Sequence, residues 1–79
     1  MNHAARRALS RYGLEMTEQD QAEIAFAIQA GEGKRLTRSP TAQVWAVNWK
    51  RADRVIPVVY HVKGKYLVTV LPACELHRT

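Results

Sequence analysis

The 79-residue chain has one cysteine, Cys74, and no long hydrophobic run. A single cysteine excludes an internal disulfide, and such low cysteine usage is typical of cytoplasmic proteins. No apolar stretch approaches the roughly 20 residues that a membrane-spanning helix needs. Residues 1–7 carry two arginines, but no apolar region follows them as it would in a secretory signal. The sequence therefore predicts a cytoplasmic protein that does not act at a membrane.

The spacings that identify metal and phosphate sites are also missing. The three histidines and Cys74 form neither a C-x-x-C nor an H-x-x-x-H pattern. The segment Gly31-Glu32-Gly33-Lys34 lacks the preceding strand and following helix of a phosphate-binding loop. No G-x-S-x-G nucleophile elbow is present either. We therefore expect no metal site and no cofactor.

Two helices are predicted in the first 30 residues. Residues 3–12 have apolar side chains at helical spacing, and Gly13 suits the left-handed position after a last turn. Thr17 precedes a segment with acids in its first turn, which predicts an N-cap and a second helix over residues 18–30. A chain of this length forms one small domain, so both helices should contribute to a single core.

The remainder of the chain is rich in β-branched and aromatic residues, which favour strands. The predicted strands span about residues 34–39, 42–50, 54–62 and 65–71. Pro57 lacks an N–H group and predicts a bulge or an unpaired edge segment in the third strand. Pro72 should end the last strand and leave residues 73–79 as a tail that frays. The predicted fold is α+β, with two N-terminal helices packed on a four-stranded antiparallel meander sheet, in two layers.

The net charge of +5 is unevenly distributed along the chain. Residues 1–14 carry three arginines and no acid, and residues 15–32 carry five acids and no base. Residues 33–54 then carry six bases against one acid. One acidic helix in a basic protein predicts a cationic surface, on the other elements, for a nucleic acid or an acidic partner.

The candidate binding residues are two tryptophans and the cations that flank them. They are Arg6, Arg7, Arg11, Lys34, Arg35, Arg38, Lys50, Arg51, Arg54, Trp45 and Trp49. If a tryptophan is exposed, base stacking beside these cations would form a platform for single-stranded nucleic acid. If the helices bury both tryptophans, only the cations remain.

A second set of residues suits catalysis without metal. A metal-independent RNase needs a base for the 2′-hydroxyl, an acid for the leaving oxygen, a cation for the phosphorane and a donor that positions the phosphate. His3, Arg7, His61 and Thr69 are residue types that fill these roles. Each also suits a structural role, as a capping, surface or ordinary strand residue.

Several short motifs resemble known proteins. They are His3-Ala4-x-x-Arg7, Arg11-Tyr12-Gly13-Leu14, Thr17-x-x-Asp20, Ile28-x-x-Gly31, Val58-Val59-Tyr60 and Val68-Thr69-Val70-Leu71-Pro72. Together they resemble small phage and prophage proteins and, more distantly, the RNase-like fold of RelE-type toxins, colicin E5 and D nucleases and barnase. This resemblance implies active-site roles for His3, Arg7 and Thr69. His61 stands where such sequences often place an acid.

In size and charge the chain also resembles anti-CRISPR proteins, which bind a host surveillance complex and block its access to DNA. Three functions follow as hypotheses. The first is a phage-type inhibitor that binds and blocks a host nucleic-acid-handling complex such as a CRISPR surveillance complex. The alternatives are a metal-independent endoribonuclease that acts on RNA, and a nucleic-acid-binding module with neither activity. The sequence leaves the oligomeric state open.

Overall fold

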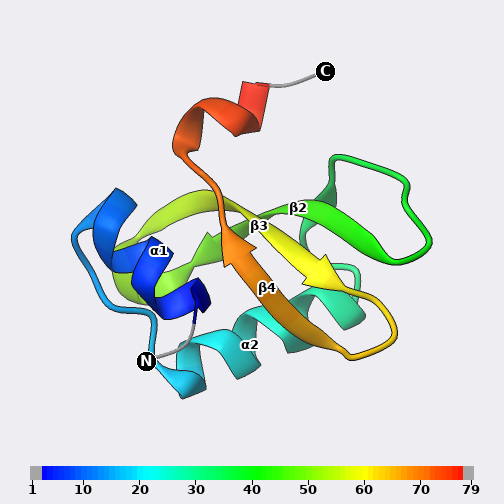
Figure 1. Cartoon of the computed structure of the whole chain (residues 1–79), viewed down its shortest axis with the longest axis horizontal. Coiled ribbons are helices and arrows are strands. Elements are labelled where there is room, and N and C mark those ends of the chain that lie inside the picture. Colours follow the sequence, from blue (N-terminus) through cyan, green and yellow to red (C-terminus); the bar gives the residue numbers. More distant parts are fainter. Residues whose placement is uncertain (1–2, 78–79) are drawn as a thin grey trace.

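The computed structural model describes residues 3–77 and shows two helices followed by a four-stranded sheet (Figure 1). The elements are α1 (His3–Tyr12), α2 (Glu18–Gln29), β1 (Lys34–Arg35), β2 (Ala42–Trp49), the 3-10 helix η1 (Lys50–Ala52), β3 (Arg54–His61), β4 (Tyr66–Val70) and the 3-10 helix η2 (Ala73–His77). The strand order is β1-β2-β3-β4, and all neighbours are antiparallel. The predicted α+β meander is therefore confirmed. In the described part of the chain, no helix has the length and apolarity to cross a bilayer.

The ends of the helices follow the local sequence signals. The Thr17 Oγ1 accepts a hydrogen bond from the Asp20 backbone N–H at 3.1 Å, and Asp20 Oδ2 accepts one from the Thr17 N–H at 3.0 Å. This reciprocal capping box satisfies two N–H groups at the start of α2. Gly13 and Gly31 follow the two helices with φ of 71° and 76°, a region that glycine enters without steric cost.

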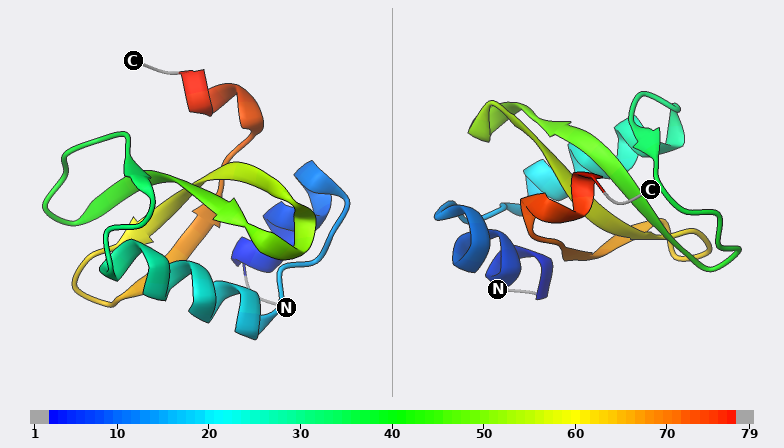
Figure 2. Two further views of the ribbon diagram at one scale, coloured as in Figure 1. Left: turned by 180° about the vertical axis from the view of Figure 1, so that it is seen from behind. Right: turned by 90° about the horizontal axis from the view of Figure 1, so that it is seen from above.

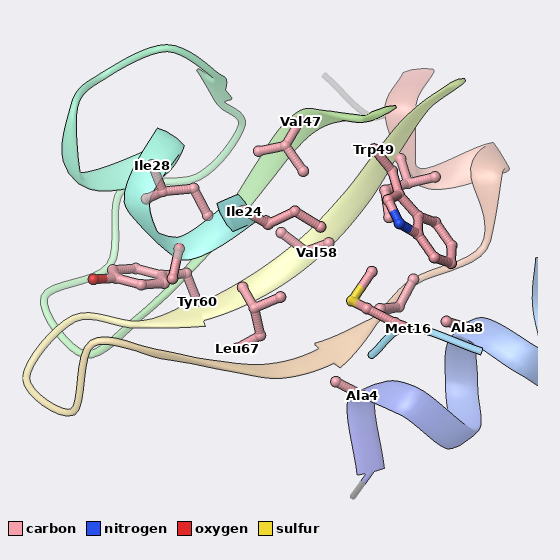
Figure 3. Close-up of a cluster of buried hydrophobic side chains, with 13 residues drawn as sticks. Ala4, Ala8, Met16, Ile24, Ile28, Val47, Trp49, Val58, Tyr60 and Leu67 are labelled. Atoms are coloured by element: carbon pink, nitrogen blue, oxygen red, sulfur yellow. The ribbon is translucent and has the colours of Figure 1, made fainter. Parts of the chain in front are cut away.

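Both helices cover the same face of the sheet. Residues paired across antiparallel strands share a face, and faces alternate along each strand. The pairs Val47↔Ile56, Trp45↔Val58 and Val58↔Val70 therefore define one face. The side chains buried between this face and the helices are Ala4, Ala8, Met16, Ile24, Ala25, Ile28, Val47, Trp49, Ile56, Val58, Tyr60, Leu67 and Val70 (Figure 3).

A β-bulge in β4 keeps this core continuous. The register shifts between Val59 and Tyr60, because Val59 pairs with Thr69 whereas Tyr60 pairs with Leu67. Val68 is the extra residue, and it lies on the second face of the sheet together with Thr69. Without the bulge, Leu67 and Val70, three residues apart, would point to opposite faces. Both are instead buried in the core.

Of the two alternatives predicted at Pro57, the bulge is not found there, and the unpaired segment is found on the side that faces β4. Pro57 lies in register opposite Ala46 of β2, and its carbonyl accepts a hydrogen bond from Leu71. The described β3–β4 pairs end at Val58↔Val70, so the missing proline N–H costs no ladder bond on the β4 side. Pro57 is buried on the second face, and Figure 2 shows η2 crossing that face. The segment predicted as a fraying tail thus forms η2 in residues 73–77.

β1 is much shorter than the predicted strand over residues 34–39. It has only two paired residues, Lys34 opposite Ala46 and Arg35 opposite Trp45. The next residue, Leu36, still donates its N–H to the Val44 carbonyl. After it, the Thr37 hydroxyl accepts the Val44 N–H in place of a backbone carbonyl. The last three residues of β2, 47–49, therefore have no β1 residue opposite them.

Candidate binding surface

The predicted basic residues fall into two groups at opposite ends of the sheet. In Figures 1 and 2, the C-terminal end of α1 lies beside η1 at one end, whereas β1 and the loop that follows it lie at the other. Arg7, Arg11, Lys50, Arg51 and Arg54 belong to the first end. Lys34, Arg35 and Arg38 belong to the second, and Arg6 lies exposed on α1. The basic residues that the sequence predicted as a binding surface are thus divided into two groups.

The first end contains three exposed arginines, one of which lies over an aromatic ring. The Arg54 guanidinium carbon lies 4.7 Å from the centre of the Tyr12 ring, in cation–π geometry. Arg7 and Arg11 lie one helical turn apart on α1, so their side chains project from neighbouring positions. All three arginines are exposed. We call Arg7, Arg11, Tyr12 and Arg54 the Tyr12 cluster.

Tyr12 anchors this cluster to the sheet. Its hydroxyl donates a 2.5 Å hydrogen bond to the Leu71 carbonyl, just after β4. Burial raises the pKa of Tyr12 above its usual value of 10.0, and the charges of Arg54 and Arg11 oppose this rise only in part. The phenol therefore stays protonated at neutral pH and keeps its hydrogen bond. Sequence reasoning had assigned Tyr12 only to the apolar stripe of the helix and missed its contact with Arg54, which is distant in sequence.

Arg51 is largely neutralised within the protein. Its Nε and Nη2 atoms lie 2.9 and 2.8 Å from Asp20 Oδ2, and Nη2 also donates to the Glu15 carbonyl. Burial tends to raise the pKa of Asp20, but the hydrogen bonds from Arg51 and Thr17 outweigh it and hold that pKa below its usual 3.8. The charge of Arg51 thus serves mainly to fasten η1 to the start of α2.

The tryptophans do not form the exposed platform that the sequence allowed. Trp49 is 1% exposed and belongs to the core, so it cannot stack on a base while the chain is folded. Trp45 is half-buried, and its indole N–H donates to the Gln43 side chain at 3.1 Å. Both residues point to the helix-covered face, because β2 alternates and the core takes its odd-numbered positions.

The four candidate catalytic residues lie in two places. His3 and Arg7 are exposed on α1, which packs against the core face of the sheet. Thr69 pairs with Val59, and His61 lies two residues further along β3, so both are on the second face. The first pair thus belongs to α1 and the second pair to the second face of the sheet. Within residues 3–77, no three histidine, cysteine or acidic side chains are grouped as a metal site would require.

His61 has a partner that sequence reasoning missed. The ring of Tyr66, its register partner, stacks on the imidazole with centroids 5.0 Å apart and planes 8° from parallel. His61 Nδ1 accepts the Gly64 N–H at 2.8 Å, so the neutral ring carries its proton on Nε2. A Cβ on Gly64 would collide with the Tyr66 ring. The four-residue turn 62–65 brings the two rings together, and hairpin register could have revealed the pair.

Comparisons with protein-family models, with curated proteins and with solved structures found no match to this chain.

Proposed function

We propose that this protein binds a polyanionic surface through the Tyr12 cluster and blocks a host nucleic-acid-handling complex, in the manner of an anti-CRISPR protein. The observation that carries the proposal is the exposure of three arginines at one end of the molecule, one of them held over Tyr12. Within residues 3–77, no ion pair joins these arginines to an acid of α2, and Asp20 is paired with Arg51. A phosphate backbone, or an acidic protein surface that occupies its place, would complement this end.

The size of the cluster favours a protein complex over naked nucleic acid as the target. Three cations that contact single-stranded phosphates predict a slope of only about −2 in log K against log salt, since each contact contributes about −0.7. Purely electrostatic binding of this kind is weak, with Kd on the order of 10⁻⁴ to 10⁻⁶ M at physiological salt. Tight inhibition would need further contacts with a protein surface.

The second face of the sheet offers such contacts where η2 does not cover it. Val55 and Val68 are exposed there, and Tyr66 lies over His61. Tyrosine and valine side chains have few rotatable bonds, so they bury apolar area on binding with a small loss of side-chain entropy. Val55 follows Arg54 in β3, so it is the apolar residue of this face that could share one contact surface with the Tyr12 cluster. Tyr66, opposite His61, lies toward the other end of β3.

The RNase alternative is not favoured by the geometry. It requires His3 and Arg7 to act in one cleft with Thr69, whereas α1 packs on the core face and Thr69 lies on the second face. Incubation with transfer and ribosomal RNA in EDTA tests this alternative directly. Defined cuts that disappear in His3→Ala would favour the RNase and count against the blocker.

The blocking function can be tested with purified CRISPR surveillance complexes and labelled target DNA. We expect the wild-type protein to reduce target binding by at least one complex, and Arg11→Glu/Arg54→Glu to lose this effect. Lys34→Glu/Arg38→Glu is the matched control, since two reversals of −2 each also take the net charge from +5 to +1. It should still inhibit. No inhibition of any complex by the wild type, or equal loss in both variants, would overturn the proposal.

A further inference from the structure

A groove of about 660 Å³ lies between α2 and the C-terminal half of β2 and reaches Lys50 at the η1 end. Its walls include Ile24 and Ala27 of α2, with Val47 and Trp49 of β2 opposite them. Phe26 stands at the groove and is 70% exposed. An apolar side chain this exposed, beside a groove with apolar walls, is typical of a surface that a partner covers.

The β2 edge along this groove has free backbone groups. Leu36 donates to the Val44 carbonyl, so the even-numbered residues of β2 direct their N–H and C=O groups toward β1. Asn48 is the next even-numbered position after Ala46, where β1 pairing begins. If β1 were longer, Glu32 would face Asn48. Glu32 instead donates its N–H to the Ala27 carbonyl at the end of α2, so no β1 residue pairs with the Asn48 backbone.

A second donor in the groove wall lacks an acceptor. The indole Nε1 of Trp49 is buried, and it has no hydrogen-bond partner among the described residues. A buried donor without an acceptor lacks the hydrogen bond that water would give it in the unfolded chain. This nitrogen is fully buried, so another chain cannot reach it, and the Asn48 edge is the part of the groove that a partner's carbonyl could complete.

The charge of the groove identifies the kind of chain that fits. Glu23 and Glu32 line it, and the third acid, Asp20, is already paired with Arg51. Lys50 stands at the η1 end and is the one unpaired base in the lining. In a protein of net charge +5, this is an acidic site. A basic segment would be attracted here and repelled by the Tyr12 cluster.

We propose that the groove between α2 and the free β2 edge binds an extended, basic segment of a partner protein as an added strand. This strand would lie beside the C-terminal end of β2, beyond the position where β1 begins at Lys34. Its backbone would pair with Asn48, one apolar side chain would pack on Phe26, and its lysines or arginines would face Glu23 and Glu32. The inference does not depend on the proposed function of the Tyr12 cluster.

The inference can be tested by adding a ten-residue peptide of alternating lysine and valine to the full-length protein. Binding measured by calorimetry should be accompanied by at least tenfold slower hydrogen exchange at the Asn48 amide, as expected if this N–H donates to the peptide backbone. A glutamate–valine peptide should not bind. The lysine–valine peptide methylated on alternate backbone nitrogens should bind at least tenfold more weakly.

Matched substitutions distinguish binding in the groove from binding that depends only on the protein's overall charge and exposed apolar area. Glu23→Lys and Phe26→Ala should each weaken peptide binding at least fivefold. Glu15→Lys makes the same charge change, and Val55→Ala also truncates an exposed apolar side chain, both outside the groove lining; they should leave binding unchanged.

Three results would overturn the inference. The first is equal binding of the methylated peptide, which would indicate attraction by charge alone. The second is an unchanged Asn48 amide in the presence of saturating peptide. The third is concentration-dependent protection of that amide without peptide, together with dimers in sedimentation, since a second copy would then occupy the groove. Arg11→Glu/Arg54→Glu should bind the peptide normally, so failure here is distinct from failure of the blocking function.

Discussion

Asp20 and Arg51, 31 residues apart in sequence, form an ion pair that joins the first turn of α2 to η1. The carboxylate is 7% exposed and the guanidinium 44% exposed, so the pair runs from the interior to the surface. The same Asp20 oxygen completes the capping box with Thr17. One side chain therefore fixes both the start of a helix and the turn between two strands.

Loss of the Asp20 charge should destabilise the fold. Asp20→Asn keeps an acceptor for the Thr17 N–H but leaves Arg51 without a counter-charge, and we expect a decrease of about 2 kcal/mol in the free energy of unfolding. Urea denaturation followed by circular dichroism measures it. Glu23→Gln, at an exposed position on the same helix, should change stability by less than about 0.5 kcal/mol. A similar small change in Asp20→Asn would show that the pair contributes little.

The same pair predicts a specific pH dependence. The pKa of Asp20 is lower in the folded chain than its usual 3.8, so its stabilisation is complete above that value and is lost as pH falls through the folded pKa. The stability difference between the wild type and Asp20→Asn should therefore be constant above about pH 5 and shrink toward about pH 2. Urea midpoints of both proteins across this range test the sign. A difference that grew on acidification would contradict the assigned cause.

Gly64→Ala should separate the two stacked rings of the hairpin. The new Cβ would displace the Tyr66 ring and lie 3.0 Å from His61 Nδ1. Because Tyr66 is exposed and can rotate, we expect a stability cost of at most about 1 kcal/mol. The clear signal is in NMR spectra, where the His61 ring protons should lose the ring-current shift from Tyr66. Lys63→Ala, in the same turn, should leave that shift unchanged.

Lys65→Gly should stabilise the same turn. Lys65 has φ of 56°, a left-handed conformation that costs a side-chain-bearing residue about 1 kcal/mol or more. Glycine removes this strain but adds entropy to the unfolded chain, which leaves an expected gain of about 0.5 kcal/mol. Thermal unfolding should show a higher Tm for Lys65→Gly. Lys63→Gly, which relieves no positive φ, should lower it.

The parts of the fold that sequence predicted well depend on local signals. Thr17 with Asp20 marks the start of α2, and Gly13 and Gly31 mark the helix ends; each of these features is confirmed. The bounds of α1, predicted as residues 3–12, are also confirmed. Capping and left-handed turns involve neighbours within about four residues, so the sequence alone displays them.

The errors arise where distant segments decide the outcome. Strand β1 ends early because the Thr37 side chain takes the place of a backbone partner opposite Val44. The bulge occurs at Val68 and not at Pro57, because the core needs both Leu67 and Val70. Residues 73–77 form η2 because the second face of the sheet, around Pro57, is available for packing. None of these pairings is visible in the local pattern of residues.

For the candidate site, sequence predicted the residue types but not their grouping. The cations of residues 6–11 and 50–54 do meet at one end of the sheet, but those of residues 34–38 lie at the other. Arg51 forms an ion pair with Asp20, and Trp49 is buried in the core. The contact of Arg54 with Tyr12 depends on how α1 packs beside β3 and β4, which the charge pattern does not contain.

The salt dependence of binding tests the central claim most directly. Fluorescence anisotropy with a labelled 20-nucleotide single-stranded DNA, between 50 and 200 mM NaCl, gives the slope of log K against log salt. We expect Arg11→Glu/Arg54→Glu to make this slope less steep by about 1.4, the share of two phosphate contacts, and Lys34→Glu/Arg38→Glu to change it far less. Equal reductions in both variants, or an unchanged slope in the first, would contradict a binding surface centred on Tyr12.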